Sequence, residues 1–458
     1  MPTTKPRPRK PPAKSATAPS ARRTRVDTTK AGASRGWRAY LTALGPGLVT
    51  GASDDDPSGI ATYSQTGAQT GLSLAWTAVI TFPMMAAVQE ICDRTALATG
   101  KGLGELANLR FQSRGRLLVR ALLVVLIVAN ALNIAGDLVA VGAGMQLLHA
   151  GPQAMWSFLA GVAICALLIG GKFHLIAKVF KILAGVLVVY VVVAFAHHPP
   201  LGELARAIFV PHVAWTKSNI GLLVAILGTT ISPYLFFWQS AHRLEEMREE
   251  DEGGNRKVPL KERSTEEAKR KTRLSRVDVF TGMAFSNLVM LAIIITTSAT
   301  LHAKGHHDVT SAAQAAEALR PIAGSMATVL FALGFIGSGM LTVPVLAGSG
   351  AVGMAGMLGK EWGFSKSPKK APVFYGLVIV GTLAGTLLSI THVNPIKLLV
   401  ISASINGVAA APFLILIMLI SGNSAIMGKL RNGRLAATVG WITTAVMAAA
   451  AIAYFLTL

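Results

Sequence analysis

Charged residues and cysteines are both scarce in this chain of 458 residues. Asp, Glu, Lys and Arg make up only 14% of it, whereas a soluble domain carries about 25%. The deficit is uneven, because long apolar runs alternate with short charged stretches, and this pattern predicts membrane spans joined by hydrated loops. Cys92 and Cys165 both lie inside apolar runs, which excludes a disulfide framework and predicts small buried side chains.

Acidic residues are few as well, with 22 against 43 basic ones and a net charge of +21. A basic chain can bind nucleic acid. Here, however, Lys and Arg gather in the first 38 residues, between Arg243 and Arg276, and in short loops, without forming a basic face with interleaved aromatic residues. We therefore expect no nucleic-acid partner. Residues 1–38 are expected to form a disordered basic cytoplasmic tail, and they lack the apolar segment of a secretory signal.

The apolar runs predict eleven spans, each long enough to cross about 30 Å of hydrocarbon. They cover residues 42–69, 72–96, 117–148, 153–171, 174–196, 218–243, 277–301, 322–350, 372–391, 394–420 and 436–457. Lys and Arg concentrate in alternate loops, which predicts a multi-pass protein of the cell membrane with a cytoplasmic N-terminus and an external C-terminus. We expect a transporter core at 39–420, a charged cytoplasmic loop at 244–276 and an additional spanning helix at 436–457.

Two of these spans are interrupted by residues that break helices. The first contains Asp54-Asp55-Asp56-Pro57-Ser58-Gly59, and the sixth contains Gly228-Thr229-Thr230-Ile231-Ser232-Pro233. Proline removes a backbone donor, and acids within a membrane are costly, so such segments are tolerated only where they line a cavity. Breaks in the first and sixth spans are typical of an all-α inverted repeat of five plus five helices, with the substrate held between the unwound segments.

The chemistry at the two breaks favours a hard cation. Asp56 supplies a negative charge, and the sixth span offers a carbonyl of Thr229 or Thr230 and the Ser232 hydroxyl. Carboxylate, carbonyl and hydroxyl oxygens are ligands that suit Mg²⁺ and Mn²⁺. An alternative reading is that Asp54, Asp55 and Asp56 cap the N-terminus of a half-helix. We expect Asp56 to be a ligand and Asp54 and Asp55 to give electrostatic support.

Several motifs resemble the Nramp family of divalent metal transporters, from about residue 41 to 420. Besides the span-six break, they are Gly45-Pro46-Gly47, Asp56-Pro57-Ser58-Gly59, Gly67-Ala68-Gln69, Gln89 and Thr99-Gly100-Lys101-Gly102-Leu103-Gly104-Glu105. The resemblance implies a LeuT-like fold with an eleventh transmembrane helix. It also implies transport of Mn²⁺, Fe²⁺ and related ions, usually coupled to protons.

The chain departs from that family at positions expected to contact the ion or to carry protons. Ser58-Gly59 replaces Gly-Asn, so Gly59 stands where the family has an amide ligand, and Ser232-Pro233-Tyr234 replaces Met-Pro-His. Gln239 stands in place of a second histidine, and Asp137-Leu138-Val139-Ala140 lacks the glutamate of the family pattern Asp-x-x-Glu. These changes resemble the Nramp-related magnesium transporters. Loss of a thioether disfavours soft metals, and loss of titratable groups predicts uptake of Mg²⁺ and Mn²⁺ without proton coupling.

Two further residues are candidate ligands. Asp137 in the third span could support the site or pair with an Arg near the cytoplasm, and Asn406 in the tenth span could bind the ion or join two helices. The main alternative function is a proton-coupled Mn²⁺/Fe²⁺ symporter, with Asp137 or Glu90 carrying the proton. No protease or esterase motif is present in the spans, so we expect a monomeric carrier in the lipid bilayer with no cofactor and no enzymatic activity.

Overall fold

Helices are the only regular elements in the part of the chain that the structure describes. This computed structural model describes residues 46–170, 185, 188–196, 201–212, 214–249, 258–390 and 394–457. The predicted tail at 1–38 and much of the predicted span at 174–196 lie outside these ranges. The prediction of an all-α protein is confirmed.

Seven helical segments of the described residues are long and apolar enough to cross a membrane. They are Ser113–Leu147, Lys217–Arg248, Thr265–Lys304, Gly324–Met357, Pro372–Ser389, Pro395–Ser421 and Arg434–Thr457. The other predicted spans contain the broken pair α2 (Pro46–Asp54) and α3 (Pro57–Thr70), then α4 (Thr77–Thr99), α7 (Gln153–Ile169) and α9 (Val188–Ala196). The count of eleven crossings stays a prediction.

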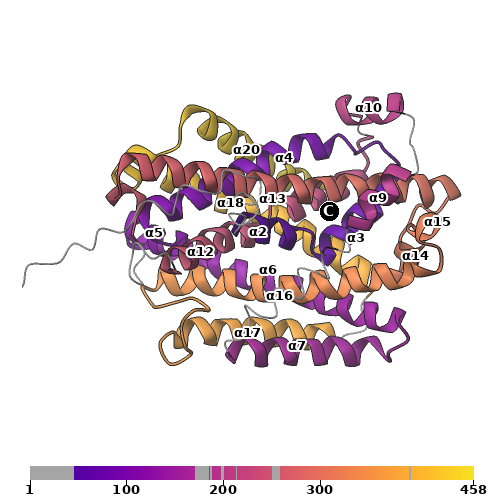
Figure 1. Cartoon of the computed structure of the whole chain (residues 1–458), viewed down its shortest axis with the longest axis horizontal. Coiled ribbons are helices and arrows are strands. Elements are labelled where there is room, and N and C mark those ends of the chain that lie inside the picture. Colours follow the sequence, from indigo (N-terminus) through magenta and orange to yellow (C-terminus); the bar gives the residue numbers. More distant parts are fainter. Residues whose placement is uncertain are drawn as a thin grey trace, which may run out of the picture. The chain divides into compact units, whose positions relative to one another are not determined.

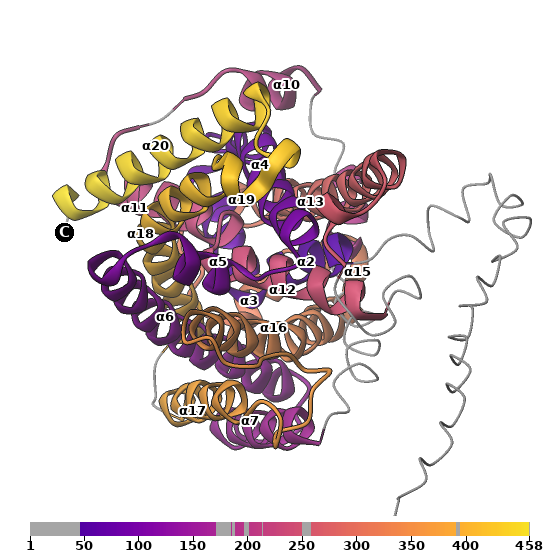
Figure 2. The same ribbon diagram turned by 90° about the vertical axis from the view of Figure 1, so that its left-hand side faces the viewer.

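Two long helices, α13 (Thr265–Thr300) and α16 (Ala327–Met357), run the length of the bundle (Figure 1). The end-on view in Figure 2 shows α17 (Pro372–Ser389) paired with α7 along one edge, beside α16 and α6 (Ser113–Leu147). On the other side α20 (Arg434–Thr457) packs against α18 (Pro395–Ser421) and α4. The two breaks therefore lie on helices enclosed by the rest of the bundle.

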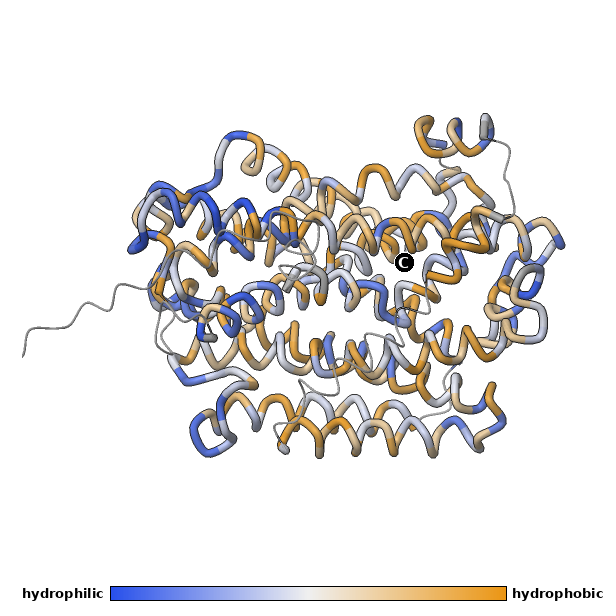
Figure 3. The backbone as a smooth tube through the Cα atoms, viewed as in Figure 1, coloured by the Kyte–Doolittle hydropathy of each residue, from blue (hydrophilic) through white to orange (hydrophobic). Residues whose placement is uncertain are grey.

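The bundle has apolar sides and hydrophilic ends (Figure 3). One end holds α5 (Leu103–Arg110), η4 (Leu260–Glu262), the start of α13 and η7 (Gly428–Leu430); we call it the basic end. Loops predicted to share one side of the membrane are joined there, because Arg94 donates to the Leu430 carbonyl at 2.6 Å and Trp362 donates to Glu105 at 2.7 Å. Segments from distant parts of the sequence therefore meet at the basic end.

Both predicted breaks are present. α2 ends at Asp54 and α3 begins at Pro57, while two residues separate the end of α11 (Lys217–Thr230) from the start of α12 (Pro233–Glu249). Proline stands at the first position of each second half, where its missing N–H has no helical partner to lose. The prediction of unwound first and sixth spans is confirmed.

Glycines allow the half-helices to pack closely against neighbouring helices. A Cβ on Gly51 of α2 would lie 2.2 Å from the Gly282 carbonyl oxygen of α13. A Cβ on Gly228 of α11 would lie 2.0 Å from the Ala403 carbonyl oxygen of α18. Backbone therefore packs directly on backbone at both contacts, as small residues allow in membrane helices.

The charged segment predicted as a loop at 244–276 is helical at both ends. α12 continues to Glu249, and α13 starts at Thr265, where the Ser264 hydroxyl accepts from the Glu267 N–H at 3.2 Å. Charged residues end the apolar pattern but are compatible with a helix that extends into water. The remaining short helices are α10 (Leu201–Phe209), η5 (His302–Lys304), α14 (Ala312–Glu317), α15 (Arg320–Ala323), η6 (Gly324–Met326) and α19 (Ser424–Met427).

Candidate cation site at the two helix breaks

Asp56 forms the N-cap of α3. Its backbone is extended, with φ −72° and ψ 169°, and its Oδ1 accepts from the Ser58 hydroxyl and the Gly59 N–H, both at 2.7 Å. The capping role that the sequence left open is thus filled by Asp56 itself. An ionised carboxylate has about four acceptor sites, so the cap leaves room for a cation.

Tyr234 joins the two breaks. Its hydroxyl, on the first turn of α12, donates to Asp56 Oδ2 at 3.2 Å and lies 3.4 Å from the Ser53 carbonyl oxygen. A second contact links Ser58 Oγ and Thr229 Oγ1 at 3.3 Å. A Cβ on Gly59 would lie 3.3 Å from Thr229 Oγ1, so the predicted residues from the first and sixth spans do meet.

The hydroxyls of the sixth-span break turn back to their own helix. Ser232 donates to the Gly228 carbonyl at 2.7 Å and to the Thr229 carbonyl at 2.9 Å. Thr230 donates to the Ile226 carbonyl at 2.9 Å. In this conformation the predicted Thr229 carbonyl ligand accepts a hydrogen bond already, and the Ser232 oxygen keeps lone pairs for a further partner.

Asp54 and Asp55 face α13 rather than Tyr234. The Ser286 hydroxyl lies 2.6 Å from Asp54 Oδ2 and 3.1 Å from Asp55 Oδ1. Each of the two acids has one buried oxygen with no hydrogen-bond partner. Electrostatic support of the site by Asp54 and Asp55 stays a prediction. The sequence reasoning missed Ser286, because one serine in an apolar helix carries no local signal.

Asp137 on α6 is fully buried, and neither of its carboxylate oxygens has a hydrogen-bond partner. The proposed Arg partner is absent among the described residues. Gly339 of α16 lies close to both α6 and the start of α3, since a Cβ there would lie 2.9 Å from the Asp137 carbonyl oxygen and 3.4 Å from Pro57 Cγ. Asp137 is therefore the least satisfied acid at the site.

Asn406 joins two helices. Its Oδ1 accepts from Asn133 Nδ2 of α6 at 3.0 Å, while Asn406 Nδ2 and Asn133 Oδ1 have no partner. This is the helix-linking role that the sequence left open for Asn406. The pair still offers a free amide oxygen from Asn133, which the sequence did not single out.

Four carboxylates thus lie inside the bundle with no basic partner in the part of the chain that the structure describes. Asp54, Asp55, Asp56 and Asp137 are each at most 1% exposed, and no Lys, Arg or His of the described ranges pairs with any of them. No three His, Cys, Asp or Glu side chains in those ranges are grouped to hold a metal ion. A cation here would be met by a carboxylate together with hydroxyl, carbonyl and water oxygens.

Gln239 lies away from the cation site, in a polar network nearer the basic end. Its amide donates to Asp93 Oδ1 at 2.7 Å and accepts from the Thr50 hydroxyl. Arg243 binds Asp93 at 2.7 Å and Asp278 at 2.9 Å. We call Asp93, Gln239, Arg243 and Asp278 the closing network, because it ties α2, α4, α12 and α13 together. Asp278 also accepts from the Gly47 N–H at 2.8 Å.

The broken helices and the buried acidic site define the class of this protein, a membrane transporter of LeuT-like fold. The described helices superpose on a manganese transporter of Eremococcus coleocola with a TM-score of 0.72, at 17% identity, covering 92% of this chain and 87% of that one. Mhp1, a nucleobase-cation-symport-1 family transporter, gives a TM-score of 0.52 at 16% identity, covering 90% and 91%. The predicted fold class is confirmed.

Sequence comparison narrows the class to a family. The chain is 27% identical over 421 residues to the divalent metal cation transporter MntH of Deinococcus radiodurans, covering 91% of this chain and 89% of that protein. The same transporter of Klebsiella pneumoniae is 25% identical over 429 residues, covering 92% and 95%. Residues 47–457 match the family described as Natural resistance-associated macrophage protein-like, Nramp. The chain belongs to this family, as its motifs predicted.

Proposed function

We propose that this protein carries divalent metal cations, Mg²⁺ and Mn²⁺, across the membrane by alternating access and without proton coupling. The observation that carries the proposal is a set of four buried carboxylates at or near the two helix breaks, none of which pairs with a basic residue among those that the structure describes. Uncompensated buried charge is costly, and a bound divalent cation would offset it. The similar transporters named above act on divalent metal cations, which supports the class of substrate.

A preference for hard ions follows from the atoms at the breaks. Ser58, Thr229 and Ser232 offer oxygen, and the residue before Pro233 is a serine rather than the methionine of the family motif. Mg²⁺ holds its water tightly and takes few protein ligands. A site with one direct carboxylate and several hydroxyls suits a partly hydrated Mg²⁺ better than a soft metal.

Uncoupled transport is supported by the two positions where the family has histidine. Tyr234 donates its hydroxyl to Asp56, and Gln239 is bound to Asp93 and Thr50. Neither side chain exchanges a proton near neutral pH. Glu90 is held by Arg94 at 3.0 Å and by Arg276 at 2.9 Å, which leaves Asp137 as the candidate proton carrier of the coupled alternative.

The topology completes the proposal. Lys and Arg are dense at the basic end, so by the positive-inside rule we propose that this end, the N-terminus and the closing network face the cytoplasm. In this proposal the closing network blocks the path from the cation site to the cytoplasm. A single chain contains both broken helices, so a monomer has a complete site.

Reconstitution into liposomes tests the proposal. Vesicles that trap a Mg²⁺ indicator and a pH dye are exposed to Mg²⁺, Mn²⁺ and, for comparison, Ca²⁺, with empty liposomes as the control. We expect Mg²⁺ and Mn²⁺ to enter without acidification of the lumen. Metal entry no faster than in empty liposomes would overturn the transport assignment. Acidification that tracks metal entry would overturn only the uncoupled mechanism.

A further inference from the structure

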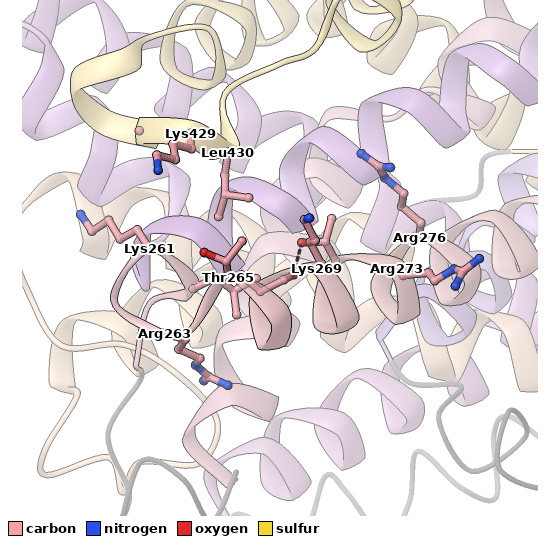
Figure 4. A pocket seen from close by; sticks show the side chains of 12 residues that line it. Lys261, Arg263, Thr265, Lys269, Arg273, Arg276, Lys429 and Leu430 are labelled. Carbon is pink, nitrogen blue, oxygen red and sulfur yellow. Dashed lines mark hydrogen bonds between the residues drawn. The ribbon is translucent and has the colours of Figure 1, made fainter. Parts of the chain in front are cut away.

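A basic pocket opens at the side of α13, at the basic end of the bundle. It has a volume of about 850 Å³ and is formed by η4, the first three turns of α13, and η7 (Figure 4). Six cationic side chains line it, and its lining within the described ranges contains no acid. The six cationic residues are Lys261, Arg263, Lys269, Arg273, Arg276 and Lys429.

Only two of these cations are neutralised by a carboxylate that the structure describes. Arg263 binds Glu267 at 2.9 Å, and Arg276 binds Glu90 at 2.9 Å. Lys261, Lys269, Arg273 and Lys429 pair with no described acid, and all four are exposed. Side chains of like charge repel one another unless an anion lies between them, so the pocket is complementary to an anion.

The floor of the pocket is apolar. Leu260 is 1% exposed and Ala268 is 9% exposed, and Leu430 covers them from η7. The η7 wall is fixed in place, since Arg94 donates to the Leu430 carbonyl at 2.6 Å. A free phosphate would interact with the cationic side chains alone, whereas a molecule with an apolar part would also contact the apolar floor.

The pocket continues into the surface of α13 that faces away from the bundle. Thr265, Lys269, Thr272 and Arg276 follow at steps of three or four residues, so they lie on one face of the helix. The next residue on that face is Phe280, which is 43% exposed, and Val277 beside it is 39% exposed. In a membrane-spanning helix, this change from cationic to exposed apolar residues marks the boundary between water and hydrocarbon.

From this arrangement we infer that the pocket binds the headgroup of an anionic phospholipid. The phosphate lies among Lys261, Lys269 and Lys429, and an acyl chain follows Val277 and Phe280 along α13. Basic pockets at the cytoplasmic ends of membrane helices suit anionic headgroups. The inference does not depend on which ion the protein carries.

The same contacts connect the lipid to the closing network. Arg276 on the rim and Arg94 behind the η7 wall share one partner, Glu90, which is 5% exposed. Glu90 precedes Asp93 by one turn of α4, and Asp93 is bound by Arg243. A headgroup that attracts Arg276 competes with Glu90, so the lipid can change the stability of the closed basic end.

Native mass spectrometry of the purified full chain tests the inference, with dioleoyl phosphatidylglycerol and phosphatidylcholine as probes. The pocket variant combines Lys261→Gln, Lys269→Gln and Lys429→Gln. The control combines Lys360→Gln, Lys369→Gln and Lys370→Gln, which removes the same charge from exposed positions in the α16–α17 loop. Phosphatidylglycerol should bind the wild type, and the pocket variant should lose at least about tenfold in affinity, with no comparable loss in the control.

A second arm separates a lipid from a soluble phosphate. Glycerophosphoglycerol has the same headgroup without acyl chains, and we expect it to compete poorly for the pocket. The lipid assignment fails if this soluble headgroup binds as tightly as the intact lipid. It also fails if both triple variants lose affinity equally, or if phosphatidylcholine binds as well as phosphatidylglycerol.

Discussion

The Tyr234 hydroxyl donates to Asp56 Oδ2 at 3.2 Å, so α12 holds the acid that caps α3. The bond joins the two helix breaks through a donor that stays protonated at neutral pH. It occupies one lone pair of Asp56 and leaves the carboxylate charge in place. A cation that binds Asp56 would therefore lie beside residues of both broken helices, as the proposed alternating-access mechanism expects.

The Asp137→Asn variant tests whether the Asp137 carboxylate contributes to ion binding or to the stability of the fold. Both Asp137 oxygens are buried without a partner, so the amide removes an uncompensated charge and the melting temperature of the metal-free protein should not fall. The concentration of Mg²⁺ that half-saturates uptake should rise about tenfold, a change of about 1.4 kcal/mol. Thermal unfolding in detergent and uptake by liposomes measure the two effects. A lower melting temperature with unchanged Mg²⁺ affinity would make Asp137 a structural residue.

Ser232→Met tests which atoms face the ion. The thioether should shift preference toward Cd²⁺ relative to Mg²⁺, by about tenfold in the ratio of transport rates. Ser232→Ala is the matched control, because it also loses the bonds to the Gly228 and Thr229 carbonyls without adding sulfur. If the two variants have the same Cd²⁺/Mg²⁺ ratio, position 232 does not contact the ion.

Arg243→Ala should destabilise the closing network. It removes the guanidinium that binds Asp93, at 0% exposure, and Asp278, at 2%, and breaking a buried ion pair in this way costs about 3–5 kcal/mol. Arg320→Ala is the control, since the Arg320–Glu317 pair is exposed and such pairs contribute about 0–1 kcal/mol. Melting temperatures of the two variants should differ clearly, and similar values would mean that the closing network contributes little.

Gly228→Ala probes the packing of α11 on α18. The added Cβ would lie 2.0 Å from the Ala403 carbonyl oxygen and 2.4 Å from the Gly407 nitrogen. Both are backbone atoms, so the helices must separate, at a cost of about 1–3 kcal/mol. Gly221→Ala on the same helix meets no atom within 4 Å and should keep or raise stability. The account of α11 fails if both variants unfold at the same temperature.

The sequence allowed the all-α fold and the two breaks to be predicted, because both have local signals. Apolar runs indicate spans, and Asp56-Pro57 and Ser232-Pro233 interrupt them. The extension of α12 to Glu249 could not be predicted from hydropathy, since that pattern ends where the helix enters water. The formation of an N-cap also depends on residues adjacent in the sequence, and Asp56 directly before Pro57 is compatible with an N-cap.

The remaining features of the site depend on residues far apart in the chain. Ser286 is 232 positions from Asp54, and Asn133 is 273 positions from Asn406. No spacing rule relates such pairs. Gln239 was expected to support the cation site. A polar side chain on a helix can form a hydrogen bond with any helix packed beside it, and Gln239 donates to Asp93 of α4.

The most direct test is Mg²⁺ uptake into liposomes by Asp56→Asn. Asn caps a helix about as well as Asp, so the variant keeps the fold of α3 and loses only the charge. Asp54→Asn serves as the comparison, because Asp54 faces Ser286 instead of Tyr234. We expect Asp56→Asn to take up Mg²⁺ at least about tenfold more slowly than wild type, with Asp54→Asn affected less. Wild-type uptake by Asp56→Asn would contradict the assignment of the cation site.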